Sequence, residues 1–249
     1  MNDALRNIWT ITKRELSGYF ASPVAYVFIV IWLLLNGFFT FMLGGFFEIG
    51  EASLDRPFFN WHPWLYLFLV PAAGMRLWSE ERRLGTMELL LTMPITAWQA
   101  IVGKFVASWL FLVIALFLTF PVVCTVTYLG DADMGQVFAG YVGSALLAGG
   151  YLAVTCMTSA MTRNQVISFI LSLVICFFLL LAGFEPVTNL LVRWAPTWLV
   201  NTVTSFSVYT HFLGFQKGVL DSRDFIFFAS LMGFSLFSTG VILRNLRSG

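Results

Sequence analysis

Six long apolar runs divide this 249-residue chain and constrain its fold more than any other feature. They cover approximately residues 24–47, 63–78, 101–128, 136–161, 165–183 and 225–243. Most reach the ~20 residues that a helix needs to cross about 30 Å of hydrocarbon. Run 63–78 is the shortest and contains Pro71, whereas Pro121 predicts a kink or tilt in run 101–128. The pattern predicts an all-α integral membrane protein with six transmembrane helices.

The composition favours the same class. Hydrophobic residues make up 59% of the chain and charged residues 11%, whereas a soluble domain has about 25% charged residues. The net charge of +1 is not gathered into a basic face, so no nucleic-acid partner is expected. Cys124, Cys156 and Cys176 lie in apolar runs without metal-ligand spacing, which favours apolar side chains over a disulfide or metal site.

Lysines and arginines predict the orientation, because they collect in cytoplasmic loops. If the N-terminus is cytoplasmic, ten of the 14 lie inside. The four outside are Arg56, Arg193, Lys217 and Arg223. We therefore expect both termini in the cytoplasm and an even number of spans.

Residues 184–224 are moderately apolar, but they are rich in Thr, Ser and Asn and contain Pro196. A seventh span here would put Arg244 and Arg247 outside. The segment is therefore predicted to be an external helical loop, with one or two short helices in the outer interface before the last span.

Residues 1–23 form an amphipathic pattern that is too polar to span the bilayer. Ile8, Trp9 and Leu16 belong to its apolar stripe, and Lys13 and Arg14 lie on the other side. We expect an interfacial helix whose cations face anionic lipid head groups, ahead of a membrane domain at 24–249. A solvated tail fits the regular stripe less well.

Small residues at four-residue spacing mark two predicted packing faces. Gly140, Ser144 and Ala148 form one on the fourth run, and Ala229 and Gly233 form the other on the sixth. Such faces let helix backbones approach closely, so we expect packing within the bundle; a subunit interface is the alternative.

The cytoplasmic segment 79–100 separates the second and third runs. From Glu80 to Pro94 it reads E-x-R-x-x-G-T-x-E-L-L-L-x-x-P, and Gly103-Lys104 follows. Gly85-Thr86 permits a sharp turn, after which Thr86 can cap a short helix. Apolar residues on one face of that helix would fit a partner's groove, with charged residues at the rim. The alternative is an ordinary loop with solvated charges.

This pattern resembles the coupling-helix region of type-2 ABC exporter permeases, and the likeness extends over essentially the whole chain. Residues 207–224 are similar to the gliding-motility (Gld-type) permease subgroup. The resemblance implies a pair of permease subunits, identical or closely related, that works with two cytoplasmic ABC ATPase subunits. Gld-type systems also include a partner with a periplasmic domain, and the resemblance implies a place in the bacterial inner membrane. The implied ATPase-coupling residues are Glu80, Glu81, Arg82, Gly85, Thr86, Glu88, Leu89, Leu90 and Pro94.

The chain has no G-x-x-x-x-G-K-[ST] motif, so we expect no enzyme activity and no cofactor in it, and Mg-ATP on the partner ATPase. Asn36 is the only strongly polar residue in the middle of the first run, and few ionisable residues lie at membrane depth, which argues against ion coupling. His62 and His211 are expected at the outer interface with polar tips. The resulting hypothesis is ATP-driven export or mechanical work on periplasmic partners. An ATP-independent channel or facilitator, and a non-transporting mechanical subunit, remain as alternatives.

Overall fold

The computed structural model describes residues 3–49, 53–86, 95–130 and 132–245, and all regular secondary structure in these ranges is helical. The N-terminal half contains α1 (Asp3–Ala21), α2 (Pro23–Phe38) with a π-helical continuation (Phe39–Leu43), α3 (Phe46–Ile49), a 3-10 turn (Phe59–Trp61), α4 (His62–Gly74), α5 (Arg76–Leu84) and α7 (Ala97–Phe117). The remaining helices are α8 (Phe120–Leu129), α9 (Met134–Met161), α10 (Gln165–Leu181), α11 (Glu185–Trp194), α12 (Thr197–Ser205), α13 (Val208–Gln216) and α14 (Ser222–Asn245).

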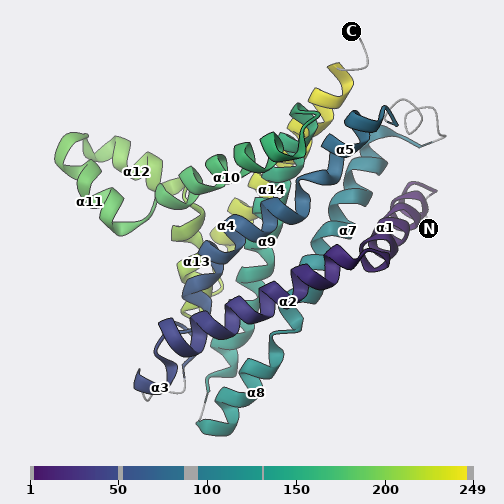
Figure 1. The fold of residues 1–249 in the computed structure, drawn as a ribbon. Coiled ribbons are helices and arrows are strands. Elements are labelled where there is room, and N and C mark those ends of the chain that lie inside the picture. The colour runs from purple at the N-terminus through teal and green to yellow at the C-terminus, as the bar shows by residue number, and fades with distance from the viewer. Residues whose placement is uncertain (1–2, 50–52, 87–94, 131, 246–249) are drawn as a thin grey trace.

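The bundle has two distinct ends (Figure 1). The charged end is formed by α1, the C-terminal part of α5, the start of α7 and the C-terminal end of α14. The opposite end is formed by α3 and α8. The lengthwise helices α2, α4, α7, α9 and α14 connect the two ends.

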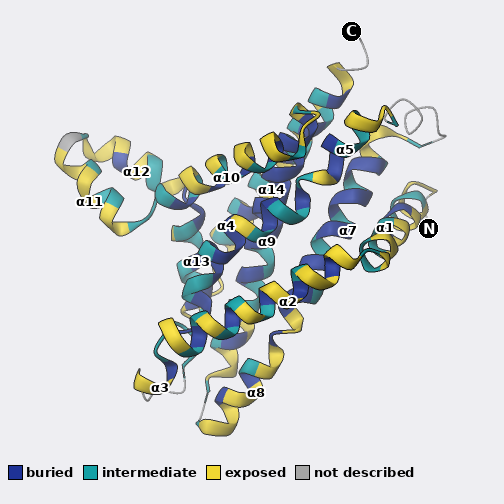
Figure 2. Ribbon diagram, viewed as in Figure 1, coloured by how far each residue is buried: buried dark blue, intermediate teal, exposed yellow. Residues whose placement is uncertain are grey.

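Helix α9 is the centre of the bundle and packs against α4, α5, α7, α10, α13 and α14. Figure 2 shows it as mostly buried, whereas α2 has a broad exposed side. A Cβ at Gly140 would lie 2.5 Å from the Phe59 ring, and one at Gly143 would lie 2.4 Å from Phe215 Cβ. Glycine thus permits the close approach of neighbouring segments, and the predicted packing face on this helix is confirmed.

The predicted packing face on α14 is wrong within this chain. Ala229 and Gly233 are exposed, and a Cβ added at Gly233 would meet no atom within 4 Å. The buried face of α14 instead carries Phe228, Ser235, Thr239 and Leu243.

Within the described ranges, four helical segments are long and apolar enough to cross a membrane: Pro23–Glu48, Ala97–Leu129, Met134–Met161 and Ser222–Asn245. A fifth is added if α10 and α11, which are bent by 69°, form one broken span. The second apolar run is divided between α4 and α5, and α5 carries four consecutive charged residues. A multi-pass helical membrane protein is therefore supported, whereas the count of six spans stays a prediction.

The expected kink near Pro121 is present. Helix α7 ends at Phe117 and α8 begins at Phe120, with Pro121 in its first turn. Proline is tolerated there because the first amides of a helix have no intrahelical partner.

Within the interfacial segment predicted at 1–23, Asp3–Ala21 form α1, which packs along α7. Ile8 and Leu16 are half-buried. Trp9 is exposed together with Lys13 and Arg14, so it does not lie on the face that packs against α7. Ser22 caps the start of α2 by accepting a hydrogen bond from the Val24 amide at 3.3 Å.

Three helices, rather than the predicted one or two, occupy residues 184–224. Helix α13 packs against α9, α10 and α14. Helices α11 and α12 contact chiefly each other and project from the side of the bundle (Figure 1). The extra helix arises because Pro196 and Ser207 each precede a new helix in this segment.

Candidate functional site at the charged end of the bundle

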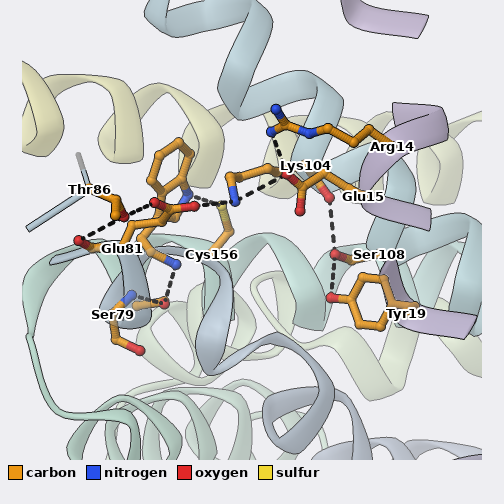
Figure 3. A network of polar contacts seen from close by, with 11 residues as sticks. Arg14, Glu15, Tyr19, Ser79, Glu81, Thr86, Lys104, Ser108 and Cys156 are labelled. Atoms are coloured by element: carbon orange, nitrogen blue, oxygen red, sulfur yellow. Dashed lines mark hydrogen bonds and ion pairs between the residues drawn. The ribbon is translucent and has the colours of Figure 1, made fainter. Parts of the chain in front are cut away.

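Lys104 is the central residue of a polar network at the charged end (Figure 3). Its Nζ lies 3.1 Å from Glu81 Oε1 on α5 and 3.5 Å from Glu15 Oε1 on α1. The same atom lies 5.6 Å from the centre of the Trp78 ring. Only 6% of the Lys104 side chain is exposed. One buried cation therefore joins three helices that are distant in the sequence.

The two carboxylates around Lys104 have further partners. Glu81 accepts a hydrogen bond from the Thr86 hydroxyl, and Glu15 pairs with Arg14 at 2.9 Å. Burial alone would raise the pKa of Glu81, but the Thr86 hydrogen bond and the Lys104 charge outweigh it, so this pKa lies below its ordinary value. Glu81 is therefore ionised at neutral pH and can hold Lys104.

Helix α5 is also anchored to α9. The break between α4 and α5 leaves backbone amides at the start of α5 without intrahelical acceptors. The amides of Trp78 and Ser79 donate to Ser159 Oγ at 2.9 and 3.0 Å, and the Ser159 hydroxyl donates to the Met75 carbonyl at 2.9 Å. Arg82 donates to the Ala160 carbonyl at 2.7 Å. These contacts fix α5 to the central helix along most of its length.

Gly103, the residue before Lys104, allows α1 to pack closely against α7. A Cβ at Gly103 would lie 2.8 Å from Ile11 Cγ2, so glycine permits α1 to approach α7 closely. Thr12 Oγ1 donates to the Gly103 carbonyl at 3.2 Å. Further along, Tyr19 and Ser108 share a hydrogen bond of 2.9 Å between their hydroxyls. The close contact brings Glu15 within reach of Lys104.

Helix α5 ends at Leu84, and Gly85, which follows it, has φ +72°. This left-handed conformation suits glycine, and the Thr86 amide donates back to the Glu81 carbonyl at 3.1 Å. The predicted turn at Gly85-Thr86 is thus confirmed. A helix following Thr86 would fall on 87–94, and Glu88, Leu89, Leu90 and Pro94 lie outside the described residues.

The predicted charged rim of segment 79–100 divides into two groups. Glu81 and Arg82 bind this chain's own helices, as described above. Glu80 is half-buried and Arg83 is exposed, and neither makes an ion pair within the described residues. Residues 79–84 belong to α5 rather than to a separate loop, because the helix that begins at Arg76 continues without interruption to Leu84.

A second polar cluster lies between α2, α4 and α9, and it corrects the prediction for His62. This side chain is fully buried, with Nδ1 2.6 Å from Ser144 Oγ and Nε2 3.1 Å from Asn36 Oδ1. The Asn36 amide donates to the Trp32 carbonyl at 2.8 Å, so its Oδ1 is the acceptor for His62. The neutral His62 ring therefore both donates and accepts a hydrogen bond inside the bundle. Asn36 and Ser144 take the place that water would have at the surface.

His211 is not a simple interfacial residue either. Its Nδ1 lies 2.6 Å from Asp224 Oδ1, and its ring stacks on Phe227 with centroids 4.0 Å apart. In the described part of the chain, neither histidine lies in a group of three or more His, Cys, Asp or Glu that could hold a metal.

Residues 65–191, about half of the chain, match the family model for the ABC-2 family transporter protein. This chain belongs to the ABC-2 transporter family. The matched region extends from α4 into α11 and contains Glu81, Lys104 and Ser159. Members are permease components of ABC transporters rather than enzymes themselves, and membership implies an ABC ATPase as partner. No curated protein matches this ABC-2 chain.

Proposed function

We propose that this ABC-2 protein is the transmembrane permease subunit of an ATP-driven transporter of the bacterial inner membrane. A separate cytoplasmic ATPase binds Mg-ATP and acts on segment 79–100. The permease converts that action into substrate export or into mechanical work on periplasmic partners. Two permease copies, identical or closely related, would work with two ATPase copies. A Gld-type system would add an accessory protein with a periplasmic domain.

The observation that supports this proposal most directly is the position of Lys104 beside segment 79–100. Glu81, which binds Lys104, lies one turn before Gly85, where the chain leaves α5. A displacement of the following residues would act on α5 first. Lys104 would then transmit the displacement to α1 and α7, and Ser159 would transmit it to α9. Packed elements joined in this way move together rather than deforming continuously.

Two substitutions distinguish binding of the ATPase from transmission of its displacement to the helices. Leu90→Asp should prevent ATPase copurification, because buried apolar anchors carry most of the energy of such interfaces. Leu220→Asp, at an exposed leucine after α13, is the matched control and should bind normally. Lys104→Met should retain the ATPase but uncouple ATP hydrolysis from transport. Normal binding and coupled turnover in both Leu90→Asp and Lys104→Met would contradict the proposal.

Flux into vesicles, measured beside ATPase turnover, separates the remaining functions. ATP-dependent flux supports export, and flux without ATP identifies a facilitator or channel. ATP turnover without flux, together with a partner-dependent rate, identifies a mechanical subunit.

The proposed orientation has its own test. Single cysteines at Arg193 and Arg247, in a chain lacking the three native cysteines, should react oppositely with an impermeant thiol reagent. Equal reaction from outside would contradict cytoplasmic termini with an external 184–224 segment.

A further inference from the structure

A groove of about 720 Å³ lies between α1 and α2 on one side and α4 and α5 on the other. Binding pockets for small ligands typically have volumes of about 300–1,000 Å³. Its α2 wall includes Val24, Val27 and Ile31, and its α4 wall includes Leu69 and Ala72. Val27 is 56% exposed although it lies in a candidate membrane span. The groove therefore offers an apolar channel open to a hydrocarbon chain.

The end of the groove near α5 is charged. Lys104, Glu81 and Glu15 lie there, and Lys104 forms an ion pair with each of the two glutamates. Arg76 and Glu80 also line the groove, four residues apart on α5, so they lie on the same side of that helix. Neither side chain makes a hydrogen bond or an ion pair within the described residues. Among the described residues, one guanidinium and one carboxylate without a partner therefore stand at the head of an apolar groove.

These charges select the headgroup of the occupant. A guanidinium binds phosphate oxygens well, and a carboxylate accepts hydrogen bonds from a primary ammonium. Within the described part of the chain, the charged residues of the groove are two cations, Arg76 and Lys104, and three carboxylates, Glu15, Glu80 and Glu81. This slight negative excess disfavours an anionic headgroup. A quaternary ammonium has no hydrogen to donate to Glu80.

We infer that the groove binds a bilayer phospholipid with a zwitterionic headgroup that ends in a primary ammonium, that is, a phosphatidylethanolamine. Arg76 holds its phosphate, Glu80 accepts from its ammonium, and one acyl chain lies between α2 and α4. The bound lipid fills the space beside the Lys104 network and supports α2 against α5. The proposed lipid binding does not require that this chain couple ATP hydrolysis to transport.

The test uses the full-length protein in nanodiscs that contain phosphatidylethanolamine, phosphatidylglycerol and phosphatidylcholine. A phosphatidylethanolamine with a diazirine in one acyl chain is photo-crosslinked, and the labelled residues are identified by mass spectrometry. We expect labels on α2 and α4 within the groove. Arg76→Gln should lower the yield about tenfold, the factor expected for loss of one charge-assisted hydrogen bond. Ala72→Trp should lower it by filling the channel.

Matched controls lie outside the groove on the same helices. Arg83→Gln removes an exposed arginine of α5, and Leu34→Trp adds bulk at a leucine of α2 that is 67% exposed. Both should retain the label. Equal labelling in Arg76→Gln and wild type, or equal yield from the matching phosphatidylglycerol or phosphatidylcholine probes, would overturn the proposal. A disulfide between two copies of an Ile31→Cys chain would also overturn it, since a second permease would then fill the groove.

Discussion

The two buried polar clusters of this permease use different chemistry at the two ends of the bundle. At the charged end, Lys104 binds the carboxylates of Glu81 and Glu15, which are 23% and 24% exposed. Toward the opposite end, His62, Asn36 and Ser144 form neutral hydrogen bonds, and all three are almost fully buried. Burying charge is costly unless water or a counter-ion remains close, so ion pairs suit the first position and neutral partners suit the second.

The difference also indicates what each cluster can do. Ion pairs act over several ångströms and tolerate movement between helices. Neutral hydrogen bonds require close, fixed geometry and fail when the partners separate. The charged cluster can therefore keep α1, α5 and α7 joined while they are displaced. The neutral cluster suits helices that keep their places, and it joins α2 and α4 to the central helix α9.

The largest loss of stability is expected for Lys104→Met, which leaves two partly buried carboxylates facing each other. Losing one partner of a fully buried pair costs about 3–5 kcal/mol, and exposure of these carboxylates reduces that to about 3 kcal/mol. The measurement is the unfolding midpoint in mixed micelles. Lys217→Met, at an exposed lysine, should have little effect. Adding Glu81→Gln to Lys104→Met should restore part of the loss; no recovery would show that the ion pair is not the cause.

His62→Leu should have the next largest effect, about 2 kcal/mol, because it leaves buried Asn36 and Ser144 without their partner. His211→Leu is the matched control and should cost less, because the His211 side chain is 20% exposed and water can replace it for Asp224. Both variants are compared by the same unfolding assay. If Lys104→Met and His62→Leu uncouple ATP hydrolysis equally without unfolding the protein, the division of roles between the clusters fails.

The sequence predicted the features that depend on local signals. Periodic apolar residues placed the long helices, Pro121 marked the break between α7 and α8, and Gly85 marked the end of α5. Small residues on α9 predicted close packing there. Each of these signals acts within one or two helical turns, so it can be recognised without knowledge of the fold.

The sequence could not predict contacts between distant residues. His62 lies in an aromatic segment that is typical of a membrane interface, and its partners are 26 and 82 positions away. Lys104 is an isolated cation in an apolar run, and its contact with Glu15 depends on α1 packing against α7. A lone charge within an apolar run was the available signal for this site, although it does not identify the partners. The predicted second span was also hard to place, because the helix breaks at Met75.

Smaller losses of stability are expected when the left-handed glycines at the two ends of the bundle are replaced. Gly85 has φ +72° with open space around it, whereas Gly218 has φ +84° and its added Cβ would lie 3.2 Å from Gln136 Cα. Gly85→Ala should cost about 1 kcal/mol from backbone strain alone. Gly218→Ala should cost more, because it adds crowding against α9. Equal losses in the unfolding assay would mean that crowding at the opposite end is relieved by small shifts.

The smallest expected effect is on the titration of Glu81. Its pKa is lowered in the folded protein, so its contribution to stability is present above the ordinary glutamate pKa and is lost as pH falls through the lower folded value. At pH 5 the Glu81–Lys104 contact should therefore persist. Isotope-edited infrared spectra of the Glu81 carboxyl group, recorded in nanodiscs, should show a carboxylate at this pH. Thr86→Val removes one hydrogen bond to the charged form and should shift the titration upward, and Lys104→Met should also shift it upward, because it removes the cation that contacts Glu81. A titration that is unchanged in both variants would show that water, rather than Thr86 and Lys104, keeps Glu81 ionised, and the contrast between the charged and neutral clusters would lose its electrostatic basis.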